Sequence, residues 1–286
     1  MKKAYLAVMI IVVAGILGCT ELKRINPTDP EASDYYVGMH YLGAIGDFSK
    51  LDAFNVMGDK IWCVDSVANR VYKYSISGDL DFSFTGVYLN SPTGICSDDT
   101  FIYVIDKDSI ISNIKRFNPE YVSDTAQLRF PNYWPTEYIK CAASNTYLYA
   151  ATATQVFRFD TAGNSIAAGT YAGFTAVSDI KYNASTDEVI VADSAADKLV
   201  VLSPSLTLIR EINFTFDLIG FAIKDNFLYI PCAAGIQKFR YDNETFVTIF
   251  ADYGEGAGKI TAPGDCGVFG DYVLVGTGTT VKYFGP

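Results

Sequence analysis

The chain has 286 residues, half of them hydrophobic, so it is long enough to bury a large core. Its 22 basic and 32 acidic residues leave a formal net charge of −10. A chain this acidic repels phosphate backbones and anionic lipid surfaces, which argues against a nucleic-acid-binding protein and against broad adhesion to membranes.

The first residues have the anatomy of a secretory signal. Lys2 and Lys3 form a short positive region, and residues 4–18 form an apolar run of fifteen residues. A membrane-spanning helix needs about 17 to 25 residues, so this run is short for a permanent span. The pattern predicts an exported protein.

The apolar run ends in Ile16-Leu17-Gly18-Cys19. These residues resemble the lipobox of bacterial lipoproteins, and the resemblance implies cleavage before Cys19 and attachment of a lipid to its sulfur. A thiolate is the nucleophile that this modification needs, and two or more acyl chains make the anchoring stable. The alternative is an ordinary signal peptide, or an uncleaved anchor, in which Cys19 is incidental.

Residues 19–36 are expected to be the lipidated cysteine and a flexible tether, because they contain Pro27, Pro30 and several charges but no apolar periodicity. Position 20 is Thr20, where enterobacterial lipoproteins kept at the inner membrane have aspartate. Resemblance to that sorting rule favours the outer membrane or the cell surface. The expected division is therefore a signal peptide at 1–18, a tether at 19–36 and a folded domain at 37–286.

The folded domain contains one pattern six times. An apolar run that ends in a small or acidic residue is followed, after a short turn, by a second run with an aromatic or aliphatic end. The first runs are 61–65, 102–106, 148–152, 189–193, 228–232 and 273–277. They start 41, 46, 41, 39 and 45 positions apart, which is the period of a β-propeller blade.

Each repeat is expected to be a four-stranded meander in which these two runs are the second and third strands. The first strands begin near Phe54, Ile95, Ile139, Ile180, Phe221 and Cys266. The fourth strands are expected near 81–85, 127–130, 165–169, 206–211 and 245–251. The sequence therefore predicts an all-β fold, a six-bladed β-propeller.

The last repeat has no residues for a fourth strand after its third strand at 281–284. Residues 37–45 have the length and pattern to supply it. We therefore expect an N-terminal strand to pair with the last blade and to close the ring, which removes exposed sheet edges.

Two repeats resemble the NHL family of propeller repeats. They are Val64-Asp65-Ser66 with Asn69-Arg70-Val71, and Ala192-Asp193-Ser194 with Asp197-Lys198-Leu199; Ile105-Asp106 matches in part. The other three repeats have Thr152, Cys232 and Thr277 in place of the aspartate. We interpret the aspartate as structural, with its carboxylate accepting backbone N–H bonds from the turn to the third strand.

Catalytic motifs are absent from the sequence. The single histidine, His40, falls in the closing strand, far from the central channel, and no nucleophile elbow, phosphate loop or zinc spacing is present. Cys63, Cys96, Cys141, Cys232 and Cys266 show no CxxC spacing. The alternatives for these cysteines are free buried thiols, one disulfide for which Cys96 and Cys141 are the candidates, or a metal site.

Four carboxylates precede first strands and are expected around one mouth of the channel. They are Asp52, Glu137, Asp179 and Asp265. Convergent carboxylate oxygens are ligands for Ca²⁺, and some six-bladed lactonases of similar shape hold a metal in this way. The alternatives are that these residues are solvated turn and cap residues, or that Lys140 and Lys181 neutralise them.

A second candidate surface is the long connection 118–135, which carries Phe130, Tyr133 and Trp134. Aromatic side chains on loops anchor interfaces, although these rings could equally pack as core. Two functional hypotheses follow. The first is a monomeric, non-catalytic, lipid-anchored module, without a cofactor, that binds a protein, peptide or glycan. The second is a Ca²⁺-dependent hydrolase or lactonase at the channel mouth.

Overall fold

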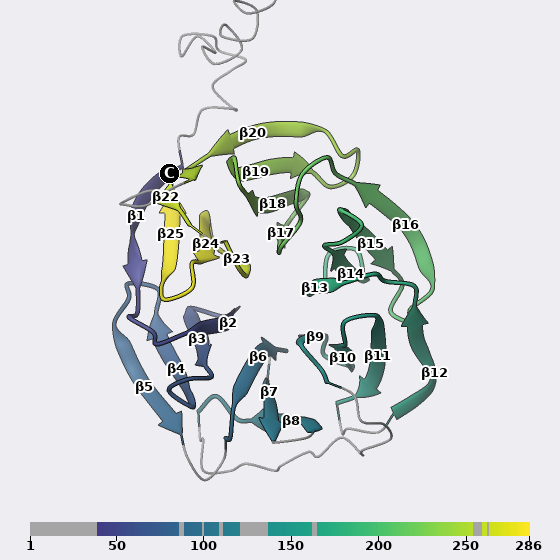
Figure 1. Ribbon diagram of the computed structural model, residues 1–286, viewed down its shortest axis with the longest axis horizontal. Coiled ribbons are helices and arrows are strands. Elements are labelled where there is room, and N and C mark those ends of the chain that lie inside the picture. Colours follow the sequence, from purple (N-terminus) through teal and green to yellow (C-terminus); the bar gives the residue numbers. More distant parts are fainter. Residues whose placement is uncertain are drawn as a thin grey trace, which may run out of the picture. The chain divides into compact units, whose positions relative to one another are not determined.

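The computed structural model describes residues 39–85, 89–98, 100–108, 111–120, 137–161, 165–253, 259–261 and 263–286. The chain divides into two compact units, Met1–Gly38 and Met39–Pro286, and all the described residues belong to the second. In this unit, six antiparallel sheets form the blades of a six-bladed β-propeller, as the repeat predicts (Figure 1). Among the described residues, no helix is long and apolar enough to cross a membrane.

The first strand of each blade lines the centre of the ring (Figure 1). These strands are β2 (Leu51–Met57), β6 (Pro92–Ser97), β9 (Lys140–Ala143), β13 (Val177–Asn183), β17 (Ala222–Lys224) and β23 (Cys266–Phe269). All six begin within three residues of the positions that the sequence predicts. Among the described residues, no strand lies beside their inner edges, so their side chains and backbone groups form the channel wall.

The second and third strands form the middle of each blade. The second strands are β3 (Lys60–Asp65), β7 (Ile102–Asp108), β10 (Tyr147–Ala151), β14 (Glu188–Asp193), β18 (Phe227–Cys232) and β24 (Tyr272–Gly276). The third strands are β4 (Arg70–Ser75), β8 (Ile111–Phe117), β11 (Gln155–Asp160), β15 (Lys198–Leu202), β19 (Gly235–Arg240) and β25 (Val281–Gly285). The second strands are buried on both faces, which explains why they are apolar runs without alternation.

The outer strands confirm the predicted meanders. They are β5 (Leu80–Thr85), β12 (Ser165–Ala172), β16 (Leu208–Asn213), β20 (Phe246–Phe250) and, in the sixth blade, β1 (His40–Ile45). The second blade has three strands among the described residues, and its fourth strand, predicted at 127–130, lies outside them. A short parallel pair, β21 (Asp252–Tyr253) and β22 (Lys259–Ile260), lies between the fifth and sixth blades in sequence.

Strand β1 closes the ring, as predicted. It pairs antiparallel with β25, from His40 opposite Gly285 to Ile45 opposite Val281. The Tyr41 ring packs edge-on against Phe284 at 5.9 Å. The sixth blade is thus built from both ends of the described chain.

The hydrophobic core is divided among the six seams between neighbouring blades. At the seam between the third and fourth blades, Tyr149, Ala151 and Val156 pack against Ile180 and Val191. Equivalent clusters occupy the other five seams. Each sheet therefore buries its faces on its two neighbours, which is why one repeat alone has no stable core.

The buried aspartates near the ends of second strands have the structural role that the sequence predicts. Their hydrogen-bond partners, however, differ in part from the predicted ones. Asp65 accepts N–H bonds from Val67 and Ala68 in the turn, as predicted. Asp193 instead accepts N–H bonds from Thr175 and Ala176, both at 2.8 Å, in the segment that leads into β13. The carboxylate thus joins the end of the second strand to the entry of the first, a contact between residues distant in sequence.

Asp106, like Asp193, bonds the segment that leads into the first strand of its own blade. It accepts N–H bonds from Asn90 and Ser91, which lead into β6, and it pairs with Lys115 at 2.6 Å. The turn between the second and third strands of the first and fourth blades also has a conformational cause. Asn69 and Asp197, just before the third strands, have φ values of 57° and 47°, a left-handed conformation that asparagine and aspartate tolerate better than most residues.

The basic residues of the third strands link blades at the rim. The Arg158 guanidinium lies 4.8 Å from the Tyr147 ring and donates to the Pro204 carbonyl of the next blade at 2.9 Å. Arg116 stacks on Phe101 at 4.3 Å and donates to the Thr161 carbonyl of the next blade. Each of these two arginines therefore has a structural role, in which it joins its blade to the next one.

Candidate functional site

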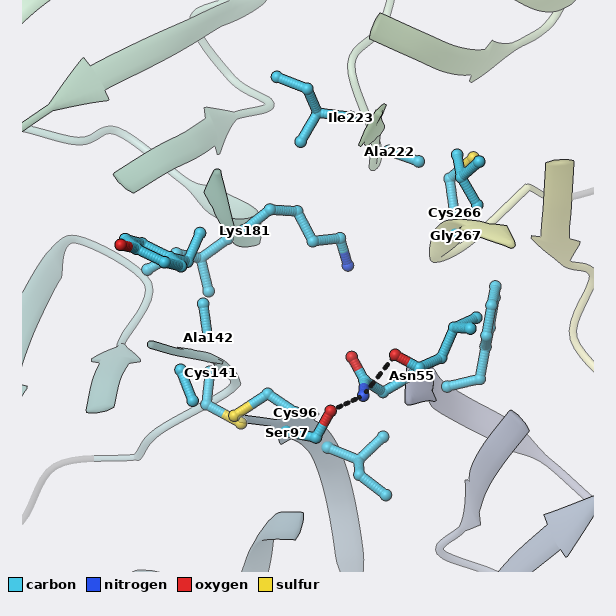
Figure 2. A pocket seen from close by; sticks show the side chains of 17 residues that line it. Asn55, Cys96, Ser97, Cys141, Ala142, Lys181, Ala222, Ile223, Cys266 and Gly267 are labelled. Atoms are coloured by element: carbon cyan, nitrogen blue, oxygen red, sulfur yellow. Dashed lines mark hydrogen bonds between the residues drawn. The ribbon is translucent and has the colours of Figure 1, made fainter. Parts of the chain in front are cut away.

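The central channel holds a cavity of about 240 Å³. Seventeen residues line it, and they come from the first strands of all six blades (Figure 2). The alternation of a β-strand places every second side chain of these strands toward the channel. The cavity is therefore a product of ring closure, and no single repeat contains it.

Lys181 is the only charged residue among the seventeen that line the cavity. Figure 2 shows its side chain extending into the cavity from β13. An ammonium carries three N–H donors and a full positive charge. In a chain of net charge −10, this cavity thus presents a cation to its contents.

The polar wall opposite Lys181 comes from the first and second blades (Figure 2). The Asn55 amide donates to Ser97 Oγ at 2.6 Å and to the Val56 carbonyl at 3.3 Å. The bond to Ser97 joins β2 to β6, and the two bonds together fix the orientation of the amide. The cavity therefore offers an ammonium on one side and amide and hydroxyl groups on the other.

Beside the cavity, four charged side chains form a cluster in the channel, defined here as the channel cluster: Lys140, Asp179, Lys181 and Asp265. Lys181 Nζ lies 3.1 Å from Asp179 Oδ1, and Lys140 pairs with Asp265. Both carboxylates are almost completely buried. Two cations and two anions leave the channel cluster without net charge.

Backbone N–H groups complete the channel cluster. Asp265 Oδ2 accepts from Phe54 N, and Asp179 Oδ2 accepts from Phe221 N, each at 3.2 Å. With Lys140, these contacts connect the first strands of five blades. A buried carboxylate is tolerated only when its lone pairs are satisfied in this way, so the channel cluster ties the blades together at the axis.

The two carboxylates of the channel cluster differ in pKa. Burial raises the pKa of Asp179 above its ordinary value, although the Lys181 ammonium opposes the rise. Burial acts to raise the pKa of Asp265 too, but the ammonium groups of Lys140 and Lys181 outweigh it and lower that pKa overall. The pair therefore has one carboxylate that ionises with difficulty and one that ionises easily.

Lys181 stays protonated at neutral pH. Burial acts to lower its pKa, but the carboxylates of Asp179 and Asp265 raise the pKa above its ordinary value. A lysine nucleophile needs the opposite shift, toward the neutral amine. The arrangement therefore suits Lys181 to hold an anion or an oxygen acceptor.

Two of the four carboxylates expected at the channel mouth, Asp179 and Asp265, share the channel cluster. Asp52 pairs with Lys50 and accepts from Ser66 N at 2.8 Å, and it lines a small pocket together with Asp265. Glu137 pairs with Lys107 at an exposed position. Among the described residues, no group of three or more His, Cys, Asp or Glu side chains is placed to hold a metal ion. Calcium binding at this mouth stays a prediction.

The remaining sequence candidates lie in different places. His40 is exposed on the outer strand β1, away from the cavity. The loop aromatics Phe130, Tyr133 and Trp134 lie outside the described residues, as does Cys19. The five propeller cysteines are free and buried, which agrees with the first of their three alternatives.

Comparisons with known proteins find no family model that matches the chain and no curated protein that is similar to it.

Proposed function

We propose that this chain is a lipid-anchored, non-catalytic binding module that receives a protein, peptide or glycan ligand at its channel cavity. The observation that carries the proposal is the cavity at the axis, in which Lys181 is the only charged lining residue. Concave sites with few, well-placed polar groups are where proteins hold ligands. Anchoring would keep that site in the cell envelope.

The cavity suits a ligand group that carries a carboxylate or several hydroxyl oxygens. Lys181 supplies N–H donors and charge, and Asn55 and Ser97 supply a polar wall that is already oriented. Acidic side chains, peptide C-termini and sugars all offer such oxygens. A volume of about 240 Å³ admits one such group and leaves the rest of the ligand at the mouth.

Binding without catalysis accounts for the charges of the channel. Lys140 pairs with Asp265 and Lys181 pairs with Asp179, and both carboxylates also accept backbone N–H bonds. The direction of its pKa shift keeps Lys181 protonated. Within the described part of the channel, the ionisable groups thus hold the blades together and place a positive charge at the cavity.

The anchoring part of the proposal has its own test. The Cys19→Ala variant should lose incorporation of a labelled fatty acid and move from the membrane fraction to the soluble fraction, because the acyl chains supply the affinity for the bilayer. Cys96→Ala, which leaves the lipobox intact, should keep both label and location. Fatty-acid labelling and envelope fractionation measure this, and a Cys19→Ala chain that retains the label would refute lipidation at this residue.

The binding part is tested by filling the cavity. Ile223 lines the cavity, and Ile209 is half exposed on the outer strand β16, so Ile223→Trp and Ile209→Trp make a matched pair. On peptide and glycan arrays, Ile223→Trp should weaken binding at least about tenfold, since blocked contacts of about 1.4 kcal/mol suffice for that. Ile209→Trp should bind as the unchanged chain does. Equal binding by both variants would exclude the cavity.

A further inference from the structure

Two thiols meet at the seam between the second and third blades. Cys96 lies on β6 and Cys141 on β9, the first strands of these neighbouring blades. Both residues line the same cavity, and burial together with the neighbouring Cys141 thiol raises the pKa of the Cys96 thiol. Figure 2 shows the two sulfur atoms adjacent in the cavity wall. This is the only such pair among the described cysteines.

The other three cysteines have different surroundings. Cys63 packs among apolar side chains at the seam between the sixth and first blades. The Cys232 sulfur accepts from Gln237 Nε2 at 3.2 Å. Cys266 lines the same cavity but on the opposite wall (Figure 2). Only Cys96 and Cys141 are therefore placed to react with each other.

We infer that Cys96 and Cys141 are a modification site, a dithiol that closes to a disulfide and joins the second and third blades covalently. The inference does not depend on the proposed function. Both cysteines line the cavity. The disulfide would therefore replace two weak S–H donors in the cavity wall with one apolar S–S bridge.

The reaction is an exchange with a small organic disulfide that enters through the channel. One cysteine attacks the small disulfide and releases one thiol, and the second cysteine then displaces the other thiol. Two protein thiols are oxidised, one small disulfide is reduced to two thiols, and the two protons pass to these products. Burial raises the pKa of the Cys96 thiol, so the thiolate is scarce and the exchange is slow in the folded protein.

The disulfide would have a structural effect in addition to its chemical one. The bond joins two cysteines that are 45 positions apart and closes a loop that includes the connection 118–135. Restricting a loop of this length in the unfolded chain stabilises the folded state. We expect the melting temperature to rise by roughly 5 to 10 °C for a domain of this size.

The experiment uses the full chain in detergent, incubated with glutathione disulfide as the oxidant. After unfolding, alkylation and digestion without reductant, mass spectrometry should find the Cys96 and Cys141 peptides joined and lighter by two hydrogen atoms. Cys63, Cys232 and Cys266 should be alkylated. Addition of a reductant should reverse both the crosslink and the rise in melting temperature.

Cysteine variants distinguish the Cys96–Cys141 pair from Cys266, the third cysteine that lines the cavity. Cys141→Ala should abolish the crosslink, whereas Cys266→Ala should leave it unchanged. If Cys141→Ala does not fold, the peptide map of the unchanged chain decides alone. Survival of all five propeller thiols, or pairing of Cys96 with any other cysteine, would overturn the inference.

Discussion

Deletion of strand β1 is expected to abolish cooperative folding of the propeller. Without His40–Ile45, the outer edge of β25 loses all of its ladder hydrogen bonds and Phe284 loses the Tyr41 ring. Ile45 is only 1% exposed, so its removal also opens the seam between the sixth and first blades. The lost burial and pairing amount to about 5 kcal/mol, comparable with the whole stability of a domain.

Circular dichroism melts and size-exclusion chromatography measure this effect. The deleted chain should show no sharp thermal transition and should elute as aggregates, because an unpaired β25 edge invites strand addition. Deletion of residues 20–36, the expected tether, serves as the control and should leave the melting temperature unchanged. A chain without β1 that still melts sharply as a monomer would contradict closure by this strand.

Replacing Lys181 by methionine is expected to cost about 3 to 5 kcal/mol in the free energy of unfolding. Asp179 is 1% exposed and would lose the ammonium that lies 3.1 Å from its carboxylate. Removing one partner of a buried pair leaves the other charge uncompensated, which costs far more than the pair contributes. Urea unfolding at neutral pH measures the loss.

The matched variant is Asp179→Asn with Lys181→Met, which removes both charges. We expect it to recover more than half of the loss, so that the double-mutant cycle shows strong coupling. Lys224→Met, at a partly exposed lysine of β17, should cost less than about 1 kcal/mol. Additive losses for Asp179 and Lys181 would show that the channel cluster does not act as a unit.

The channel cluster also determines how the free energy of unfolding changes with pH. The pKa of Asp265 is lowered in the folded protein, so this residue stabilises the fold above its ordinary pKa, and that stability is lost as the pH falls through the lowered value. The pKa of Asp179 is raised, so its ionised form opposes folding and its protonation at lower pH relieves that cost. Asp179→Asn should therefore steepen the loss of stability toward acid pH.

The blades were predictable because the strand pattern of each blade lies within one short, continuous stretch of sequence. Second strands such as β14 are buried on both faces, so apolar runs recur at a nearly constant spacing that the sequence displays directly. The closing strand β1 was predictable because the sixth repeat itself supplies only three strands, β23 to β25, and residues 37–45 have the pattern of a fourth. The turns before the third strands of the first and fourth blades have asparagine or aspartate, Asn69 and Asp197, where the backbone is left-handed.

The site was predictable only in part, because its contacts depend on how the ring closes. Lys140 and Asp265 are 125 positions apart, and only the closed ring brings them together. The sequence places Asp52 and Glu137 at equivalent strand starts, but each of them pairs with a nearby lysine outside the channel cluster, Lys50 or Lys107. Spacing along the chain indicates which strand end a residue occupies, but it does not indicate which neighbouring charge that residue meets.

The central claim, that the ligand enters the channel cavity, is tested most directly by photo-crosslinking in the intact cell envelope. A photoreactive amino acid at Ile223, in the cavity wall, is compared with one at Ile209, on the outer strand β16. We expect an adduct from position 223 that is absent from position 209 and is reduced by free peptide or glycan taken from the array. Adducts from position 209 alone would contradict the claim and place recognition on the outer rim.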